Sequence, residues 1–298
     1  MLNLPNIKTN ISLAPYTTYK IGGTAEYFFT ANNKEYLVTA ITEAKKEQIP
    51  FFILGTGANI LIGDRGFRGL VIHNQARNFT FRENLLIADS GATVADLIKE
   101  SLDRELSGLE HFAGIPSSVG GAIRQNLHFL SPDRTDTLFI ESIVREGVVL
   151  EGITERRVGK DYFKFGYDDS ILHHNKEIIV LEIIFELERK DPQLIESQIK
   201  ANLDWRNEKQ PQLNEFPSCG SVFKKIEGVG AGRLIDKCGL KGKCIGGAKI
   251  SEKHANYFVN TGNATAREVR ELISLVQKTV FKETGFKLEP EIEFLGEF

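Results

Sequence analysis

The chain carries apolar residues at two spacings, one typical of helices and the other of buried strands. Within residues 34–48 the apolar positions recur three and four residues apart, which indicates one face of an amphipathic helix. Short apolar runs follow at 51–54 and 70–72, separated by glycine-rich turns, and such runs are typical of buried strands. Open α/β sheets bind ligands in the loops at their strand ends, so we expect a functional loop after residue 54.

The middle of the chain continues this mixture of helices and strands. Residues 85–91 form a predicted strand, and Thr93 is placed to cap a helix with an apolar face. Residues 108–123 are rich in glycine and serine and show little periodicity, so we predict a loop there. The run 177–189 is rich in β-branched residues and predicts a strand, which a helical stripe at 194–203 follows.

A last unit begins near Asn207, in the polar stretch NEKQPQLNEFPS. Thr265 and Glu268 have the spacing of a capping box, in which each side chain satisfies a backbone N–H group at the start of a helix. Residues 286–294 predict a closing strand. Together these patterns predict a chain of mixed α and β structure with an appended C-terminal unit.

Composition narrows the class of protein. The chain has 298 residues, 41% hydrophobic and 26% charged, which is enough for two or three domains of roughly 100–150 residues. Its formal net charge of −3 lacks the basic excess expected of a nucleic-acid-binding protein. The first residues do not resemble a signal peptide, and no apolar run approaches the roughly 20 residues that a membrane span needs. We therefore expect a soluble, cytoplasmic protein.

Cysteine and histidine residues do not point to a metal site. Cys219, Cys238 and Cys244 are an odd number without the paired spacing of zinc ligands, and they predict reduced thiols. His173 and His174 are adjacent, which cannot place both on one helical face, so we interpret them as solvated loop residues. We expect no bound metal.

Two glycine-rich stretches are candidates for binding a phosphate-bearing ligand. The first, GTGANIL at 55–61, can present several peptide N–H groups, but it lacks the third glycine of a dinucleotide fingerprint and has no Walker lysine. A tight turn between a strand and a helix explains it equally well. The second stretch is AGIPSSVGGAI at 113–123. Two such loops favour one large ligand that is held at two points.

The stretch PSCGSVFKK at 217–225 places Ser221 between a glycine and two apolar residues. It lacks the G-x-S-x-G elbow of a serine hydrolase, and nothing marks His254 as the partner in a triad. The local sequence therefore leaves three roles open for Ser221: a nucleophile, a proton donor or a turn residue. In LEPEIEF, alternation places Glu291 and Glu293 on one face of a strand. The sequence favours the interpretation that this is the polar face of an edge strand over the interpretation that Glu291 is a positioned carboxylic acid.

Seven stretches of the chain, taken in order, carry a resemblance to one family. They are YTTYKIGGTAEYFF, LGTGANILIGDRGFRGLVI, SGLEHFAGIPSSVGGAI, FGYDDS, PSCGSVF, AGRLIDKCGLKGKCIGGAKIS and LEPEI. Their order is similar to that of the UDP-N-acetylenolpyruvoylglucosamine reductase (MurB) family, and the resemblance covers nearly the whole chain. Any one stretch is weak by itself, whereas seven in order are specific.

The resemblance implies an α+β flavoprotein of three domains. A two-part FAD-binding region of the vanillyl-alcohol-oxidase (PCMH) type would occupy residues 1–73 and 74–206, and an α/β substrate domain would occupy 207–298. The implied activity is the reduction of UDP-N-acetylglucosamine enolpyruvate to UDP-N-acetylmuramate, with FAD and NADPH as cofactors. This reaction serves peptidoglycan synthesis, and with it cell wall biogenesis, cell shape and cell division. The resemblance further implies a cytoplasmic monomer whose partner is the UDP-sugar.

The same resemblance implies roles for individual residues. Ser221 matches the serine that protonates the intermediate formed after hydride transfer from the flavin N5, and Glu291 matches a carboxyl group that assists at the same centre. The implied cofactor-binding residues are Gly55, Thr56, Gly57, Ala58, Asn59, Ile60, Gly114, Ile115, Pro116, Ser118, Gly120, Gly121 and Asn126. The implied substrate-binding residues are Tyr167, Lys209, Lys225 and His254.

The chain also departs from the family pattern. Asp168 stands where the family has a catalytic arginine, and this exchange is costly beside a developing negative charge, because one electrostatic donor is typically worth about 2.7–4 kcal/mol. Lys225 replaces an asparagine, and NLHFLS at 126–131 replaces a stretch of small residues. Lys224, Lys225 and Arg124 are candidates to substitute for the missing cation.

The spacing after Ser221 resembles the short-loop subtype, type II, because only seven residues separate Phe223 from Ala231. Two functions remain open. Ser221 and Glu291 favour an active flavin-dependent reductase, whereas Asp168 favours a protein that binds flavin or UDP-sugar with impaired catalysis. A serine hydrolase is the least favoured function.

Overall fold

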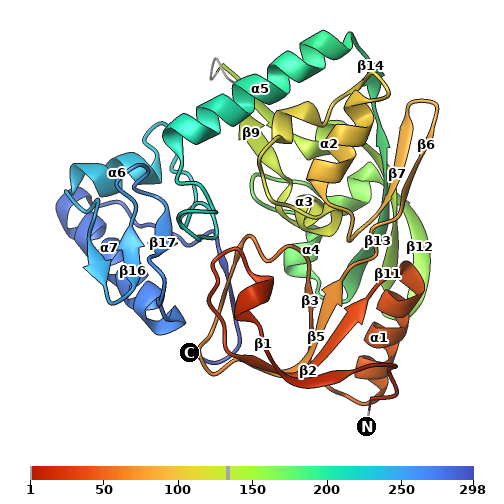
Figure 1. Cartoon of the computed structure of the whole chain (residues 1–298), viewed down its shortest axis with the longest axis horizontal. Coiled ribbons are helices and arrows are strands. Elements are labelled where there is room, and N and C mark those ends of the chain that lie inside the picture. Colours follow the sequence, from red (N-terminus) through yellow and green to blue (C-terminus); the bar gives the residue numbers. More distant parts are fainter. Residues whose placement is uncertain (1, 132–134) are drawn as a thin grey trace. The chain divides into compact units, whose positions relative to one another are not determined.

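The computed structural model describes residues 2–131 and 135–298, and the chain divides into two compact units (Figure 1). The first unit comprises Met1–Asn6, Phe29–Thr56 and Ile72–Arg206. The second comprises Ile7–Phe28, Gly57–Val71 and Asn207–Phe298. Each unit is therefore assembled from segments that lie far apart in the sequence. The division into three domains stays a prediction.

The first unit is built around a five-stranded antiparallel sheet of order β12-β11-β13-β7-β6. Its strands are β6 (Phe79–Arg82), β7 (Leu85–Asp89), β11 (Val144–Glu151), β12 (Thr154–Gly159) and β13 (Ile178–Glu186). The β-branched run therefore forms the central strand β13, where seven of nine residues are buried. Most of the predicted strand at 177–189 is confirmed, and its end forms the short β14 (Glu188–Arg189).

Helices α2 (Val94–Leu102), α3 (Val119–Gln125) and α4 (Ile171–His174) lie on one face of this sheet (Figure 1). Thr93 Oγ1 accepts a hydrogen bond from the peptide N–H of Asp96 at 3.1 Å, which confirms the predicted cap of α2. The loop predictions were wrong for α3 and for the two histidines in α4. Helices of seven and four residues are too short to show the apolar repeat from which helices are predicted.

The other elements of the first unit are mostly short. They are α1 (Lys34–Lys46), β3 (Phe51–Leu54), β8 (Leu106–Ser107), η2 (Glu110–Phe112), β9 (His128–Leu130), β10 (Thr137–Phe139), η3 (Ile140–Ser142) and η4 (Lys160–Phe163). The division between the units falls within three elements, β2 (Thr24–Ala31), β5 (Phe67–Asn74) and α5 (Pro192–Lys209). Strands β1 (Lys8–Ser12), β2, β5 and β3 form a sheet in that order.

The second unit contains a small antiparallel sheet with helices α6 and α7 beside it (Figure 1). Its elements are η1 (Ala14–Tyr16), β4 (Ile60–Ile62), α6 (Ala231–Lys237), β15 (Cys244–Ile245), β16 (Ala248–Ile250), β17 (Phe258–Asn260), α7 (Ala266–Thr284) and β18 (Glu293–Leu295). The side chains of Thr265 and Glu268 make both hydrogen bonds of the capping box, as predicted. The inward face of α7 is the centre of this unit's apolar core.

The predicted strand at 286–294 is wrong over most of its length, because only Glu293–Leu295 is a strand, paired in parallel with β4. Pro290 interrupts the segment, since proline has no N–H group to donate, and it pairs with Phe223 only as an isolated bridge. Cys219 is 2% exposed and belongs to the apolar core of this unit. Across the described ranges every helix is too short or too polar to cross a bilayer.

Candidate active site

The first glycine-rich loop follows strand β3, and its turn requires glycine at one position. Gly57 has a φ of +65°, and a Cβ atom there would lie 2.3 Å from the carbonyl oxygen of Tyr16. The carbonyl of Gly57 accepts hydrogen bonds from the peptide N–H of Thr18 at 3.1 Å and from its hydroxyl at 3.3 Å. Contact with residues 16–18 therefore fixes this part of the loop in a conformation that only glycine adopts without strain.

The two glycine-rich loops lie against each other within the first unit. Thr56 Oγ1 donates to the carbonyl oxygen of Pro116 at 3.0 Å. A Cβ atom on Gly55 would lie 2.4 Å from Ser118 Oγ, so only glycine permits this approach. The two loops are therefore in direct contact, which is compatible with one ligand held by both.

The second loop is anchored where helix α3 begins. Ser118 caps the helix, because its Oγ accepts the peptide N–H of Gly121 at 3.3 Å. The N–H of Gly120 donates to the carbonyl of Ser90 at 2.8 Å, and a Cβ atom on Gly120 would lie 3.2 Å from that oxygen. These two N–H groups bind within the protein and so fix the position of the start of the helix.

Helix α5 brings a cation to the same loop. Gly114 has a φ of +82°, and a Cβ atom there would lie 3.0 Å from Arg206 Nε. The guanidinium of Arg206 also lies 5.5 Å from the centre of the Phe129 ring, against which Trp205 packs edge-on at 5.4 Å. Nothing in the sequence pointed to Arg206, because it sits in a helix without a recognisable motif.

Asn126 joins the end of α3 to a turn that is distant in the sequence. It adopts a left-handed conformation at the C-cap of the helix and is 1% exposed. Its Nδ2 donates to the carbonyl of Gly166 at 2.9 Å, and its Oδ1 accepts the N–H of Glu141 at 3.4 Å. The side chain of this predicted cofactor-binding residue therefore fixes the turn that carries Tyr167.

The side chains of Tyr167 and Asp168 both contact His128. Asp168 is 6% exposed and has a φ of +52°, a conformation that aspartate tolerates better than most residues. His128 Nδ1 lies 3.5 Å from Asp168 Oδ1, and His128 Nε2 lies 3.2 Å from the Tyr167 hydroxyl. The side chain of Arg124, a candidate replacement cation, donates to the carbonyl of Leu172 at 2.9 Å. His128 was missed, although it lies in NLHFLS, the stretch that departs from the family.

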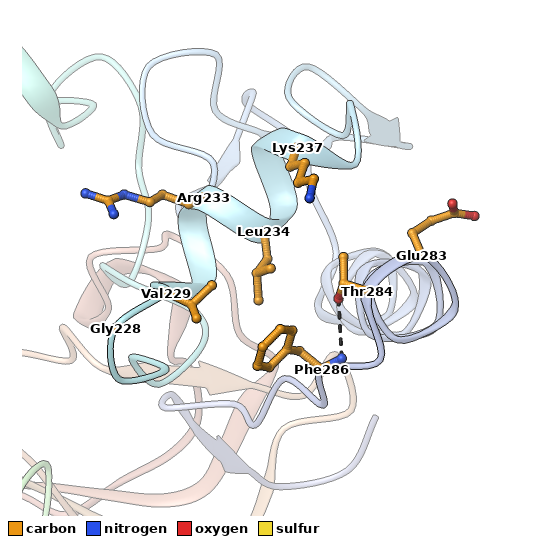
Figure 2. Close-up of a pocket in the computed structure, with 8 residues that line it drawn as sticks. All are labelled: Gly228, Val229, Arg233, Leu234, Lys237, Glu283, Thr284 and Phe286. Carbon is orange, nitrogen blue, oxygen red and sulfur yellow. Dashed lines mark hydrogen bonds between the residues drawn. The ribbon is translucent and has the colours of Figure 1, made fainter.

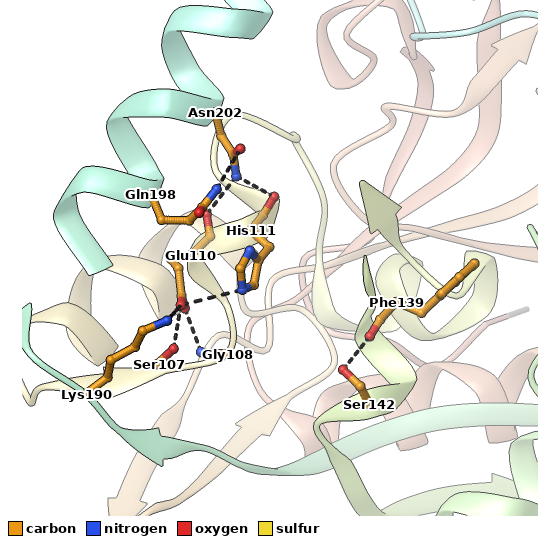
Figure 3. Close-up of polar contacts among 9 residues, drawn as sticks. All are labelled: Ser107, Gly108, Glu110, His111, Phe139, Ser142, Lys190, Gln198 and Asn202. Carbon is orange, nitrogen blue, oxygen red and sulfur yellow. Dashed lines mark hydrogen bonds and ion pairs between the residues drawn. The ribbon is translucent and has the colours of Figure 1, made fainter. Parts of the chain in front are cut away.

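A buried carboxylate supports the turn that leads into the second loop (Figure 3). Glu110 is 1% exposed and accepts hydrogen bonds from Ser107 Oγ at 2.5 Å and from the N–H of Gly108 at 2.6 Å. Lys190 Nζ lies 3.8 Å from the same carboxylate. Asn202 of α5 donates to the backbone carbonyl of Glu110 at 3.3 Å. The sequence did not reveal Glu110, because a single glutamate near glycines looks like a surface residue.

In the second unit, Ser221 and Glu291 lie on neighbouring segments. Gly220 precedes Ser221 with a φ of +82°, and Ser221 forms an antiparallel bridge with Tyr257. The N–H of Glu291 donates to the carbonyl of Val222 at 2.8 Å. Asn59 Nδ2 donates to the carbonyl of Glu291 at 3.4 Å, so the glycine-rich loop reaches this segment as well. The fold thus brings together three residues that are far apart in sequence.

The thiol of Cys219 is protonated at neutral pH. Burial raises the pKa of this thiol far above its usual value, and the nearby carboxylate of Glu291 raises it further. A neutral thiol is a poor nucleophile. Cys219 therefore fills space beside the Ser221 segment as a neutral thiol.

His254 is a neutral side chain in this unit. Burial lowers its pKa to about 4, and the positive charge of Lys241 acts in the same direction. Its Nδ1 accepts the peptide N–H of Asn256 at 3.2 Å, which leaves the proton of the neutral ring on Nε2. The ring lies 4.8 Å from the ring of Tyr257. His254 can therefore donate one hydrogen bond to a ligand without carrying a charge.

The predicted substrate-binding lysines lie at the surface. Lys209 ends α5 and pairs with its neighbour Glu208. Lys225 is exposed, and Lys224 Nζ lies 3.9 Å from Glu289. The ammonium groups of Lys209 and Lys224 lie near carboxylates, and Lys225 is exposed.

One pocket of the second unit does not contain the predicted residues (Figure 2). It lies between α6 and the end of α7, with Val229, Leu234 and Phe286 on its apolar side and Lys237 and Glu283 at its edge. None of its eight lining residues is a candidate for the site. This pocket is therefore not the predicted site.

Comparison with known proteins gives the same assignment over nearly the whole chain. Residues 25–134 match the family described as FAD binding domain, and residues 210–295 match UDP-N-acetylenolpyruvoylglucosamine reductase, C-terminal domain. The reductase of that name from Caldanaerobacter subterraneus subsp. tengcongensis is 37% identical over 97% of this chain and 93% of its own length. UDP-N-acetylenolpyruvoylglucosamine reductase 2 from Bacillus anthracis is 39% identical, over 98% and 93%.

A solved structure is similar as well. The crystal structure of UDP-N-acetylenolpyruvylglucosamine reductase (MurB) from Thermus caldophilus matches with a TM-score of 0.81 and 30% identity. The match covers 96% of this chain and 98% of the other. Both the sequence and the backbone are therefore similar over almost their full length.

Proposed function

The chain belongs to the UDP-N-acetylenolpyruvoylglucosamine reductase family, and from this we propose that it is an FAD-dependent oxidoreductase of peptidoglycan precursor synthesis. It reduces UDP-N-acetylglucosamine enolpyruvate to UDP-N-acetylmuramate, which is the activity of a UDP-N-acetylmuramate dehydrogenase. The observation that carries this proposal is the likeness to a reductase of that name over 97% of the chain. The match to an FAD binding domain supports the flavin.

The two glycine-rich loops fit a large, phosphate-bearing cofactor. FAD, when bound, supplies the hydride carrier between NADPH and the substrate. Residues 55–60 and 114–121 would hold it, and their support is the direct contact of Thr56 with Pro116 and the close approach of Gly55 to Ser118. NADPH as the hydride source rests on the family alone.

Ser221 is proposed as the proton donor and Glu291 as the carboxyl group that assists it. Hydride addition to one carbon of the enolpyruvyl group builds negative charge on its neighbour, which needs a nearby donor and electrostatic support. The proposal is supported by the hydrogen bond from the N–H of Glu291 to Val222, the residue after Ser221. A serine hydroxyl is a weak acid, so its position has to be fixed closely.

The substrate-binding residues are proposed to be Tyr167, Lys209, Lys225 and His254. The lysine ammonium groups suit the diphosphate of a UDP-sugar, and the neutral ring of His254 suits a single hydrogen bond. We further propose that the chain is of the short-loop type and acts as a monomer in the cytoplasm, as its family relationship implies.

A second function, flavin or UDP-sugar binding with impaired catalysis, is favoured by Asp168. Its carboxylate occupies the position of the family's arginine and lies 3.5 Å from His128. If the missing cation limits the reaction, Asp168→Arg raises the rate at which the substrate reoxidises reduced flavin. If the rate falls instead, His128 and Asp168 form a working arrangement and the impaired function is excluded.

The proposed function is tested with the purified holoprotein. We expect a yellow protein that consumes NADPH when it is given UDP-N-acetylglucosamine enolpyruvate. Ser221→Ala should slow reoxidation of the flavin by substrate about 10²–10⁴-fold, the usual contribution of a general acid. Ser274→Ala, on the exposed side of α7, is the control and should leave the rate unchanged. A colourless protein that cannot be reconstituted with FAD contradicts the proposal.

A further inference from the structure

Asn256 binds the segment that carries Ser221 through both its backbone and its side chain. Its Oδ1 accepts the peptide N–H of Phe223 at 3.0 Å, and its Nδ2 donates to the carbonyl of Phe223 at 2.8 Å. Its own carbonyl accepts the N–H of Val222 at 2.8 Å. Asn256 is 6% exposed, so water does not compete for these bonds. Two consecutive residues after Ser221 are thus bound to one asparagine.

The opposite edge of the same segment is bound by the segment that carries Glu291. The carbonyl of Val222 accepts the N–H of Glu291 at 2.8 Å, and Phe223 pairs with Pro290 in an antiparallel bridge. Asn256 and Glu291 therefore hold the two polar groups of the Val222 backbone from opposite sides. Any movement of the segment relative to Asn256 also changes its relation to Glu291.

The side chain of Asn256 makes the two hydrogen bonds to Phe223 that the backbone of a neighbouring strand would make in a regular sheet. Ser221 pairs with Tyr257 and Phe223 pairs with Pro290 as isolated bridges, and the N–H groups of Glu291 and Lys224 donate to the carbonyls of Val222 and Glu289 on either side of the second bridge. An amide side chain presents one donor and one acceptor, which match the carbonyl and the N–H of one residue. Asn256 supplies this pair to Phe223.

We propose that Asn256 is a positioning residue that sets the place of the Ser221 hydroxyl relative to the Glu291 carboxyl group. This inference rests on the proposed function, in which Ser221 donates the proton. Asn256 acts through the backbone of residues 222 and 223 and does not itself need to touch the substrate. A misplacement of about 1 Å at a reacting group can cost a factor of about 10² in rate.

The test separates the two half-reactions of the FAD-loaded enzyme by stopped-flow absorbance of the flavin. Asn256→Ala should leave the reduction of flavin by NADPH within about twofold of the parent. It should slow reoxidation by UDP-N-acetylglucosamine enolpyruvate about 10–100-fold, with little change in the substrate concentration at half-maximal rate. Asn256→Asp keeps the acceptor for Phe223 N–H but places an oxygen against the Phe223 carbonyl, so it should show the same loss and serves if the alanine variant does not fold.

Asn260→Ala is the matched control. Asn260 is 4% exposed in the same unit, and its side chain also makes backbone hydrogen bonds, to Tyr19, Gly262 and Ala264. The Ser221 segment is not among these partners. Asn260→Ala should lower the free energy of unfolding about as much as Asn256→Ala does. It should not selectively slow the reoxidation of flavin by substrate.

A double-mutant cycle with Ser221→Ala distinguishes positioning from a general structural effect. In the Ser221→Ala background, Asn256→Ala should lower the reoxidation rate by less than about threefold, because the group it positions is already absent. A full additional loss, or equal slowing of both half-reactions, overturns the inference. If Ser221→Ala by itself leaves reoxidation unchanged, the proposed role of Ser221 has failed instead.

Discussion

Removal of the Glu110 carboxylate perturbs a buried polar cluster near the second loop (Figure 3). Glu110→Ala leaves the hydroxyl of Ser107 and the N–H of Gly108 without their acceptor. Glu110 is only 1% exposed, so water does not readily replace the lost carboxylate. The neighbouring His111 contributes little electrostatic attraction to Glu110, because its ring is neutral at neutral pH. Burial lowers the pKa of the ring, and this outweighs the opposite effect of the Glu110 carboxylate. The cost therefore comes from two orphaned donors.

The magnitude follows from those two donors. A buried donor that loses its acceptor costs about 1–3 kcal/mol, so the pair gives roughly 2–6 kcal/mol. The ion pair with Lys190 contributes little more, because that side chain is 42% exposed and can be hydrated when the carboxylate is absent. We expect Glu110→Ala to lower the free energy of unfolding by about 3–5 kcal/mol. Glu110→Gln retains one acceptor and should lose about 1–2 kcal/mol.

The assay is urea unfolding followed by tryptophan fluorescence of the FAD-free protein. Trp205 is the only tryptophan of the chain, and it packs against Phe129 at 5.4 Å in the first unit. Asn202, one turn before it on α5, is bound to the carbonyls of Glu110 and His111, so the signal reports on this region. The variant should also bind FAD more weakly, because the turn leads directly into residues 113–118.

The control is Glu100→Ala, which removes an exposed i,i+4 ion pair with Arg104 and should cost less than about 1 kcal/mol. A loss below about 1 kcal/mol in Glu110→Ala refutes the reasoning, since the orphaned donors would then have found other partners. Normal stability with weakened FAD binding would assign Glu110 to the cofactor rather than to the fold.

Three further predictions concern other parts of the fold. Gly57→Ala introduces a Cβ atom 2.3 Å from the Tyr16 carbonyl at a φ of +65°, so it should cost at least about 1–3 kcal/mol in urea unfolding and weaken FAD binding in a fluorescence titration. Thr265→Ala removes the cap of α7 and should cost about 1 kcal/mol; an unchanged melting temperature would contradict the role of its bond to Glu268. The folded pKa of His254 is about 4, below its value of 6.5 in an unfolded chain, so its stabilising contribution is present above pH 6.5 and is lost as the pH falls through 4. This contribution is about 3 kcal/mol, and His254→Gln should flatten the pH dependence of unfolding in that window.

Elements with strong local signals could be predicted from the sequence. The β-branched run at 177–189 is central in its sheet, and the caps at Thr93 and Thr265 form as their spacing indicates. Short helices such as Val119–Gln125 were missed, because seven residues hold too few turns to show periodicity. The segment 286–292 was mistaken for a strand, because alternation alone does not reveal that Pro290 breaks the ladder.

The sequence by itself determined the family of this protein and two glycine-rich loops, because motifs and composition are local properties of the chain. It also marked Ser221 and Glu291, although their chemistry stayed open without the resemblance. Only the tertiary structure decided which groups meet. Thr56 hydrogen-bonds Pro116, and His128 contacts both Tyr167 and Asp168. Asn256 hydrogen-bonds the backbone of Phe223, two residues after Ser221. Such contacts join residues separated by tens of positions, and they form only when burial makes each polar group find a partner.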